Sequence, residues 1–268
     1  SIEKKYKGLE CVSQVYSKLG VIPGQIIAPG FSQRPVVAAV MRAKTEKISG
    51  LFRAMTVVDI DSSETGADSY DKVYEWKTQN SYVHENMICC YPMVKIDDIV
   101  YHYSTMWAAM TMKTDAENGN NPYVSPSNKN LPITGLVTES GKSVYLDLSQ
   151  ASMLNGNGIC TAINLNGWKT RGNNTSIYPS NTDVKDRFIP VRRFFSWWGN
   201  SFILTYFQKV DSPMNRRLID AVVDSENIRA NGYVARGMLA GAKIEFRESE
   251  NPVTDLLNGI LRFHQFLT

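Results

Sequence analysis

The sequence has little of what membrane-spanning, disulfide-rich or zinc-binding proteins need. None of its apolar runs approaches the roughly 18 consecutive residues that cross a bilayer. Its 268 residues contain four cysteines, which are too few for a disulfide scaffold and do not have the spacing of a zinc site: Cys11, Cys89, Cys90 and Cys160. Such sparse cysteines favour reduced, mostly buried thiols in a protein that is assembled in a cytoplasm.

An excess of charge of one sign is also missing. The chain carries 29 basic and 26 acidic residues, a net charge of +3, and this balance argues against nucleic acid or an anionic membrane as partner. Hydrophobic residues make up 43% of the chain and aromatic residues 10%, which suffices for a packed core and excludes wholesale disorder.

Helix and strand patterns alternate over the first hundred residues. The expected elements, in chain order, are helix 4–19, strand 25–28, helix 34–48, strand 51–61, helix 69–79 and strand 86–94. The strand at 51–61 is continuously apolar in its centre, as strands covered on both faces are. This order predicts a mostly parallel sheet with flanking helices, and alternation along the third strand points Cys89 and Cys90 to opposite faces.

The rest of the chain changes character twice. Two stretches rich in Asn, Ser, Gly and Pro, at 112–130 and 166–183, are predicted to be long polar loops. After them come an aromatic helix from about Val191, helices at 213–225 and 230–239, and strands at 241–249 and 259–268. The predicted class is α/β (α+β overall), in three parts: 1–100, a loop-rich 101–186, and a helix-strand part 187–268 packed on the first.

Ser32 is the first candidate functional residue, in the stretch QIIAPGFSQRP (25–35). A catalytic serine needs a histidine base and a carboxylate, and the chain has three histidines: His84, His102 and His264. The nucleophile pattern G-x-S-x-G is broken, because Arg34 stands where its second glycine belongs. We therefore expect Ser32 to cap the following helix after a rigid turn formed by Pro29 and Gly30.

Asp59 and Asp61 follow a predicted strand, at a place where α/β sheets bind ligands or Mg²⁺. Without a phosphate-binding loop or a third acidic residue at a useful spacing, capping of the next turn is the favoured interpretation. No catalytic set, metal or cofactor is expected. The alternative left open is an α/β hydrolase or nucleotide-binding enzyme that uses Ser32, Asp59 and one of the histidines.

Two arginine pairs are candidate contacts. Arg192 and Arg193 precede the aromatic helix, and they are interpreted as a solvated or ion-paired edge or as a contact to another subunit. Arg216 and Arg217 lie on a predicted helix and are plausible contacts to an acidic partner, although a solvated helix face explains them equally well.

Several stretches, taken in order, resemble the tail sheath protein family of contractile bacteriophage tails and related particles. They are similar to a strand and turn before a helix, a second strand, a helix that ends in Thr-Asp before a loop, a strand that leads to a tryptophan and a turn, a helix start, and closing strands of the family's core. Lys169 to Gly172 departs from the family's spacing. The stretches are IIAPGFS (26–32), VVDID (57–61), the segment 104–131 with SPSN, GICTAINLNGWKTRGNNT (158–175), FIPVRRFF (188–195) and 237–268.

The resemblance implies a structural subunit rather than an enzyme. Sheath subunits stack as hexameric rings around a tail tube, and their contraction drives the tube through a cell envelope. The implied partners are other copies, the tail tube protein, and baseplate and tail terminator proteins, in a virion tail assembled in the host bacterial cytoplasm. We expect this chain to be a core without the family's terminal arms. A receptor- or baseplate-type structural protein is a third possibility.

Overall fold

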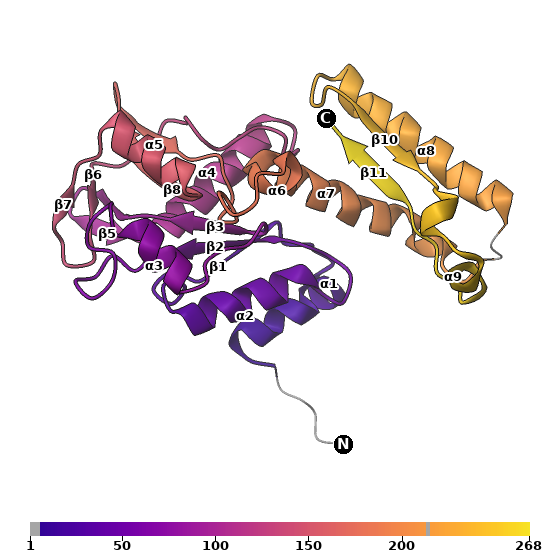
Figure 1. The fold of residues 1–268 in the computed structure, drawn as a ribbon, viewed down its shortest axis with the longest axis horizontal. Coiled ribbons are helices and arrows are strands. Elements are labelled where there is room, and N and C mark those ends of the chain that lie inside the picture. The colour runs from indigo at the N-terminus through magenta and orange to yellow at the C-terminus, as the bar shows by residue number, and fades with distance from the viewer. Residues whose placement is uncertain (1–5, 213–214) are drawn as a thin grey trace. The chain divides into compact units, whose positions relative to one another are not determined.

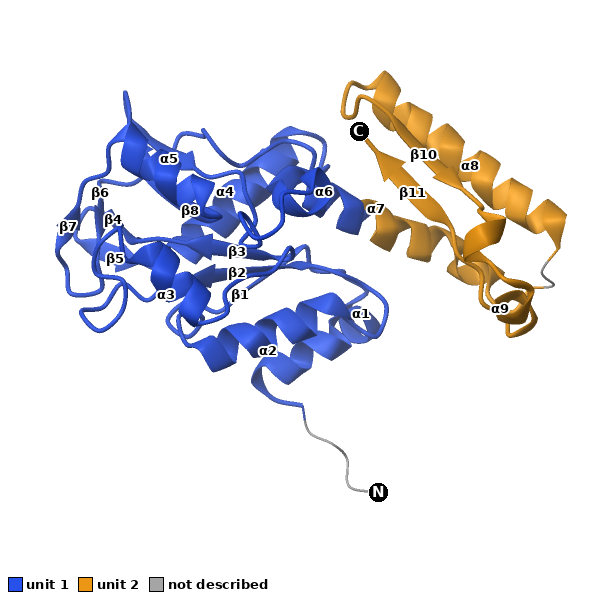
Figure 2. Ribbon diagram, in the orientation of Figure 1, with its two compact units in different colours: residues 1–197 blue, residues 198–268 orange. Residues whose placement is uncertain are grey.

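A computed structural model describes residues 6–212 and 215–268 and divides the chain into two compact units (Figures 1 and 2). Unit 1 is Ser1–Trp197 and unit 2 is Trp198–Thr268, so the boundary falls inside helix α7 (Ile189–Tyr206). The predicted three-part division, with its last part packed on the first, stays a prediction.

A five-stranded sheet forms the centre of unit 1, in the order β1-β2-β3-β8-β9 (Figure 1). The first four strands are parallel and the last is antiparallel to its neighbour. Their bounds are β1 (Gln25–Ile27), β2 (Met55–Asp59), β3 (Met87–Cys90), β8 (Ile159–Asn164) and β9 (Trp168–Arg171). Every residue of β2 and β3 is buried, and the predicted α/β class is confirmed.

Helices cover both faces of this sheet. One core contains Met41, Val73 and Cys89, and the other contains Trp107 and Cys90, so the neighbouring cysteines point to opposite faces as predicted. The helices of unit 1 before α7 are η1 (Gly8–Gln14), α1 (Val15–Leu19), α2 (Pro35–Glu46), α3 (Val73–Gln79), α4 (Tyr103–Glu117), α5 (Leu148–Gly156) and α6 (Val184–Arg187).

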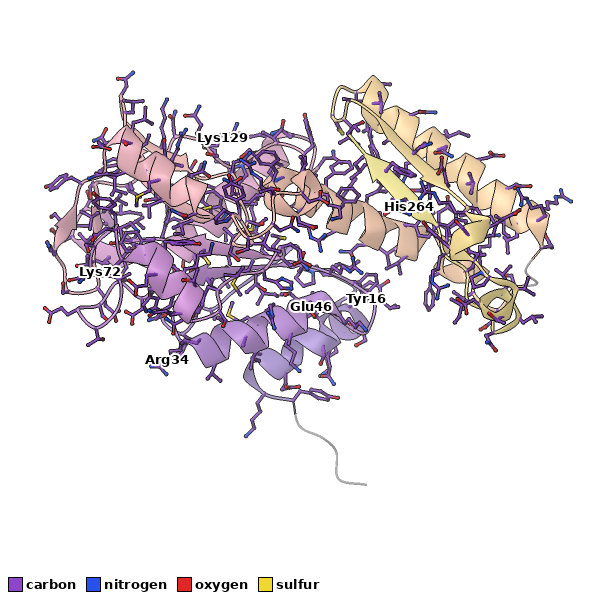
Figure 3. All side chains as sticks on the ribbon, viewed as in Figure 1. Tyr16, Arg34, Glu46, Lys72, Lys129 and His264 are labelled. Carbon is purple, nitrogen blue, oxygen red and sulfur yellow. The ribbon has the colours of Figure 1, made fainter. Side chains whose placement is uncertain are left out.

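Two of these helices match the sequence signals at their ends. Gly20 ends α1 in the left-handed conformation, with φ 66°. Pro35 occupies the first turn of α2, where its missing N–H costs nothing. Arg34 and Glu46 mark the two ends of α2 in Figure 3. Residues 4 and 5 of the first predicted helix lie outside the described residues.

The predicted strand at 86–94 is in fact two strands in two sheets. β3 ends before Tyr91-Pro92, and β4 (Met93–Ile96) enters an antiparallel sheet of order β5-β4-β6-β7. Proline has no N–H to donate and does not continue a central ladder. The other strands of this second sheet are β5 (Ile99–Tyr101), β6 (Gly135–Val137) and β7 (Ser143–Val144).

Both predicted loops are shorter than expected. The first starts after α4, which continues to Glu117 and includes Thr114, whose hydroxyl donates to the Met110 carbonyl at 2.8 Å. The second contains β9, where buried Thr170 donates to the Pro126 carbonyl at 2.6 Å. Polar residues that find partners in this way remain compatible with regular structure.

Unit 2 combines helices with a two-stranded antiparallel sheet of β10 (Ala242–Glu245) and β11 (His264–Leu267). The two predicted helices at 213–225 and 230–239 are one helix, α8 (Arg216–Ala235); residues 213 and 214 lie outside the described residues. Glu226 interrupts the apolar pattern, yet it is buried and accepts a hydrogen bond from the Trp198 indole. The shorter elements are η2 (Phe207–Lys209), η3 (Glu248–Glu250) and α9 (Val253–Leu257).

Among the described residues, the helices are all too short or too polar to pass through a bilayer.

Candidate functional site

The candidate site lies where β1 and β2 end, and it begins with a tight turn. The Ala28 carbonyl accepts hydrogen bonds from the backbone N–H groups of Phe31, at 3.0 Å, and Ser32, at 2.8 Å. Gly30 has φ 78°, a left-handed conformation that favours glycine. Pro29 and Gly30 thus form the turn that delivers Ser32 to the edge of the sheet.

The prediction that Ser32 caps α2 is wrong. The N-cap position belongs to Arg34, and no side chain caps that end. Ser32 is fully buried, and its hydroxyl donates to Asp59 Oδ2 at 3.0 Å and accepts from the Asp59 N–H at 3.0 Å. The chain continues two residues past Ser32 before the helix begins, so the end of β2 provides its partners instead.

Asp59 caps a helix, but not one that follows it directly. Its Oδ1 accepts from the Ser104 N–H at 2.8 Å, and its Oδ2 accepts from the Ser104 hydroxyl at 2.6 Å, in the first turn of α4. Burial raises the pKa of the Asp59 carboxyl, and the hydrogen bonds from Ser104 and Ser32 oppose that rise. Asp61 has the expected local role and accepts from the Ser63 N–H at 2.9 Å.

The structure brings His102 to the same place, so the three residue types of the enzyme hypothesis do meet. His102 Nδ1 lies 3.8 Å from Asp59 Oδ2, beyond hydrogen-bonding distance. In a catalytic triad the serine donates to the histidine and the histidine to the carboxylate. Here Ser32 donates directly to Asp59, and it is inaccessible to a substrate. The arrangement ties β1, β2 and α4 together, and it does not support the enzyme alternative.

The other two histidines have local partners. His84 lies 3.3 Å from a Glu46 carboxylate oxygen, and burial lowers the pKa of His84. His264 pairs with Glu250 at 2.9 Å in unit 2. Within the described ranges, no three His, Cys, Asp or Glu side chains are grouped so that they could hold a metal ion.

The first arginine pair is an ion-paired edge within unit 1. Arg192 contacts Asp186 at 3.1 Å and donates to Asn86 Oδ1 at 2.7 Å. Arg193 is 7% exposed and pairs with Asp115. The structure thus shows the ion-paired edge, one of the two interpretations left open. A contact of either arginine to another subunit or to the tube stays a prediction.

The second pair is exposed in unit 2. Arg216 pairs with Asp220 at 3.1 Å and with Glu248 at 3.6 Å, and Arg217 is exposed beside it. Their predicted role as contacts to a partner stays a prediction.

Sequence analysis missed a second feature, the open edge of β11 in the β10-β11 sheet. Within residues 6–212 and 215–268, β10 and β11 pair only with each other. The outer side of β10 is covered by α8, because the Asn227 side chain accepts from the Ile244 N–H at 2.9 Å and donates to the Ile244 carbonyl at 3.0 Å. The outer side of β11 is therefore the edge that is available to a strand from another chain. The signal available in the sequence was two predicted strands, at 241–249 and 259–268, that follow a helical segment.

Known proteins resemble this chain along nearly its whole length. No protein-family model matches it. The tail sheath protein of Burkholderia phage BcepMu is 27% identical over 266 residues, which are 95% of this chain and 54% of that protein. The tail sheath protein of Escherichia phage P2 is 24% identical, over 96% of this chain and 62% of that protein. The chain thus spans between about half and two thirds of these relatives.

Solved structures agree in fold. The anti-feeding prophage helical sheath in its contracted state matches 97% of this chain and 70% of its own, with a TM-score of 0.73 and 19% identity. The sheath complex of an extracellular contractile injection system, PVC, in its contracted state also matches 97% of this chain and 70% of its own, with a TM-score of 0.71 and 16% identity. Sequence and fold together confirm the resemblance that the ordered motifs indicated.

Proposed function

From this relationship to contractile tail sheath proteins, we propose that the chain forms the core of a sheath subunit. Copies of it stack as rings around a tail tube, and their contraction drives the tube through a cell envelope. The observation that carries the proposal is the match of nearly the whole chain to sheath proteins in both sequence and fold. The protein acts by assembly and movement, and it is not an enzyme.

Buried hydrogen bonds between its elements make unit 1 suitable for moving as a rigid body. Asp59 joins Ser32 after β1 to Ser104 in α4. Lys77 in α3 is 1% exposed, and its ammonium donates to the carbonyls of Asn157 at 2.6 Å and Tyr178 at 3.0 Å. Buried polar groups satisfied in this way restrict the core to one arrangement. A sheath subunit that changes its neighbours during contraction needs such an invariant interior.

The open edge of β11 is where neighbouring copies join. An extended segment of another copy adds a strand there, with backbone hydrogen bonds giving the affinity, whereas Asn227 already bonds the outer backbone groups of Ile244 in β10. Head-to-tail contacts of this kind build open helical stacks rather than closed dimers. Arg216 and Arg217 lie on α8 of the same unit and contact an acidic surface of a neighbour or of the tube.

The remaining partners follow from the same assembly. They are the tail tube protein along the sheath and baseplate and tail terminator proteins at its ends. The protein is located in a virion tail, or in a prophage-derived particle, and is assembled in the cytoplasm of the host bacterium.

Negative-stain microscopy of the full-length protein tests this proposal. We expect tubes with regular axial striations, of one or both of two diameters. Discs or isolated caps without tubes would instead indicate a baseplate-type protein.

The enzyme alternative is tested separately with Ser32→Ala. Losing two hydrogen bonds to buried Asp59 should lower the free energy of unfolding by about 1–3 kcal/mol. A broad esterase and phosphatase screen of the parent should find no turnover. Turnover in the parent that is lost in a folded Ser32→Ala variant would overturn the structural proposal.

A further inference from the structure

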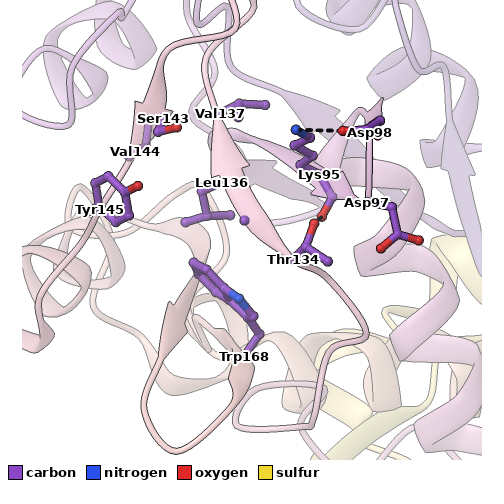
Figure 4. Close-up of a pocket in the computed structure, with 11 residues that line it drawn as sticks. Lys95, Asp97, Asp98, Thr134, Leu136, Val137, Ser143, Val144, Tyr145 and Trp168 are labelled. Carbon is purple, nitrogen blue, oxygen red and sulfur yellow. Dashed lines mark hydrogen bonds and ion pairs between the residues drawn. The ribbon is translucent and has the colours of Figure 1, made fainter.

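A solvent-open groove on unit 1 lies apart from the Ser32–Asp59 cluster. It has a volume of about 510 Å³, within the range of small-molecule sites. The β4–β5 turn, strands β6 and β7, and the first residue of β9 line it (Figure 4). Assembly through the β11 edge makes no use of this groove.

Two aromatic rings lie on one side of the groove. Trp168 is partly buried against the core of unit 1, and its carbonyl accepts from the Leu131 N–H at 2.8 Å, so its position is held. Tyr145 is 84% exposed. In the described part of the chain, neither side chain stacks on another aromatic ring. The two rings thus offer apolar surface to a ligand.

Polar side chains lie on the other side of the groove (Figure 4). Lys95 pairs with Asp98 at 3.4 Å, and the Thr134 hydroxyl donates to the Lys95 carbonyl at 3.0 Å. Asp97 is exposed in the turn, with φ 51°, so its carboxylate faces water. Donors and acceptors are therefore both present, with the positive charge of Lys95 already balanced by Asp98.

The presence of aromatic rings on one side and polar side chains on the other favours one class of ligand over others. A phosphate would meet one ion-paired lysine and two carboxylates, which disfavours anions. A small cation would find only Asp97 uncompensated, in a solvent-open site where one charge gives little binding energy. A sugar ring uses both sides of the groove, because its C–H groups face the negative faces of aromatic rings while its hydroxyls both donate and accept.

We propose that this groove binds a neutral saccharide, with Tyr145 and Trp168 contacting the sugar ring and Asp97 accepting hydrogen bonds from its hydroxyls. The proposal is independent of the sheath function, because it concerns a site on an isolated unit. Envelope and capsule glycans contain such rings, so the groove gives the protein a way to contact carbohydrate.

Ligand-observed saturation-transfer NMR tests this directly with the full chain. The probes are a panel of neutral mono- and disaccharides, with inorganic phosphate and spermidine as competing classes. We expect at least one saccharide to receive saturation at its ring protons. Tyr145→Ala and Asp97→Asn should each weaken its affinity about tenfold, a change of 1.4 kcal/mol. Asparagine is chosen at 97 because it tolerates positive φ.

Tyr74→Ala is the matched control, because Tyr74 is an exposed tyrosine on α3 that does not line the groove. It should leave saccharide affinity unchanged. Three results would each overturn the proposal: no saccharide binding, stronger binding of phosphate or spermidine, or saccharide binding that both groove variants retain. Circular dichroism of each variant confirms that it is folded before binding is compared.

Discussion

At the scale of single residues, the most informative groups are buried and ionisable. Asp59 and Lys77 are both almost inaccessible, and their hydrogen-bond partners are neutral groups; the titratable group that faces Asp59 is His102, whose Nδ1 lies 3.8 Å from Asp59 Oδ2. Burial shifts the pKa of each group toward its neutral form. Stability should therefore depend on pH in opposite ways around the two residues.

Asp59→Asn tests the carboxyl. Because the pKa of Asp59 is raised in the folded state, the folded protein holds more protons than the unfolded chain just above pH 3.8. The parent's stability should fall, relative to Asp59→Asn, as the pH rises through this window. Urea unfolding of both proteins at a series of pH values measures the difference.

Asp59→Ala is the companion variant to Asp59→Asn. It removes the carboxylate that accepts from the Ser32 and Ser104 hydroxyls and from the Ser104 N–H, so it should cost about 1–3 kcal/mol at any pH in that window. If the parent became more stable relative to Asp59→Asn as the pH rises, the pKa of Asp59 would not be raised in the folded state.

Lys77→Met tests the buried ammonium. Burial lowers the pKa of Lys77 to about 8, against 10.5 for an exposed lysine. Between these values the unfolded chain binds more protons, so the parent should gain on the order of 3 kcal/mol relative to Lys77→Met as the pH rises from 8 to 10.5. Denaturant titrations at both ends of this range measure the gain.

Lys72→Met is the control for Lys77, since Lys72 is an exposed lysine of the same segment, paired with Asp68. The free energy of unfolding of Lys72→Met should change with pH over this range as that of the parent does. A constant difference between parent and Lys77→Met would show that the ammonium is not desolvated.

At the scale of elements, the α5–β8 connection approaches its neighbours closely. Gly158 has φ 69°, and a Cβ there would lie 2.5 Å from the Thr175 carbonyl and 2.7 Å from the Tyr178 carbonyl. Gly156, two residues earlier at the end of α5, has open space around its Cβ position. A comparison of alanine substitutions at the two glycines therefore distinguishes the effect of backbone strain and overlap from that of helix propensity.

Gly158→Ala should therefore lower the free energy of unfolding by several kcal/mol, on the order of 3 or more, because both strain and overlap arise. Gly156→Ala should be neutral or stabilising by about 0.4–1 kcal/mol. Thermal unfolding of the two variants beside the parent measures this contrast. Equal effects of the two substitutions would show that the close approach at 158 is not tight.

Elements defined by local patterns were predictable from sequence, and those defined by distant partners were not. Pro35 and the apolar spacing after it predicted α2, and the uninterrupted apolar run predicted buried β2. The pairing of Ser32 with Asp59 joins residues 27 positions apart, and no local rule indicates it. For the same reason α8 was divided at Glu226, whose burial depends on Trp198. The sequence singled out Ser32 and Asp59, but their bonding partners required the fold.

At the scale of the whole molecule, assembly is the property to measure. Arg217→Glu should reduce the amount of tube formed by the full-length protein, because it reverses an exposed charge that we assign to an interface. Lys113→Glu is the matched control, an exposed lysine on α4 of unit 1. Sedimentation of tubes followed by microscopy gives the yield. Equal tube yields from the two variants would show that Arg217 does not contribute to the interface.

The 268-residue chain should be mainly monomeric at micromolar concentration, because strand exchange needs an extended segment and each strand within residues 6–212 and 215–268 already pairs inside the chain. Light scattering across a concentration series checks this. Spontaneous tubes would show that the contacts between cores alone hold the lattice.

The distribution of thiols has a practical consequence. Cys11 is exposed, while Cys89, Cys90 and Cys160 are buried, and burial raises the pKa of Cys89 to about 12. Maleimide should therefore modify a single sulfur in the native protein and four after denaturation, which mass spectrometry can count. The molecule thus comes with a natural attachment point for one fluorophore, through which the motion of individual subunits could be followed by optical methods without engineering a cysteine.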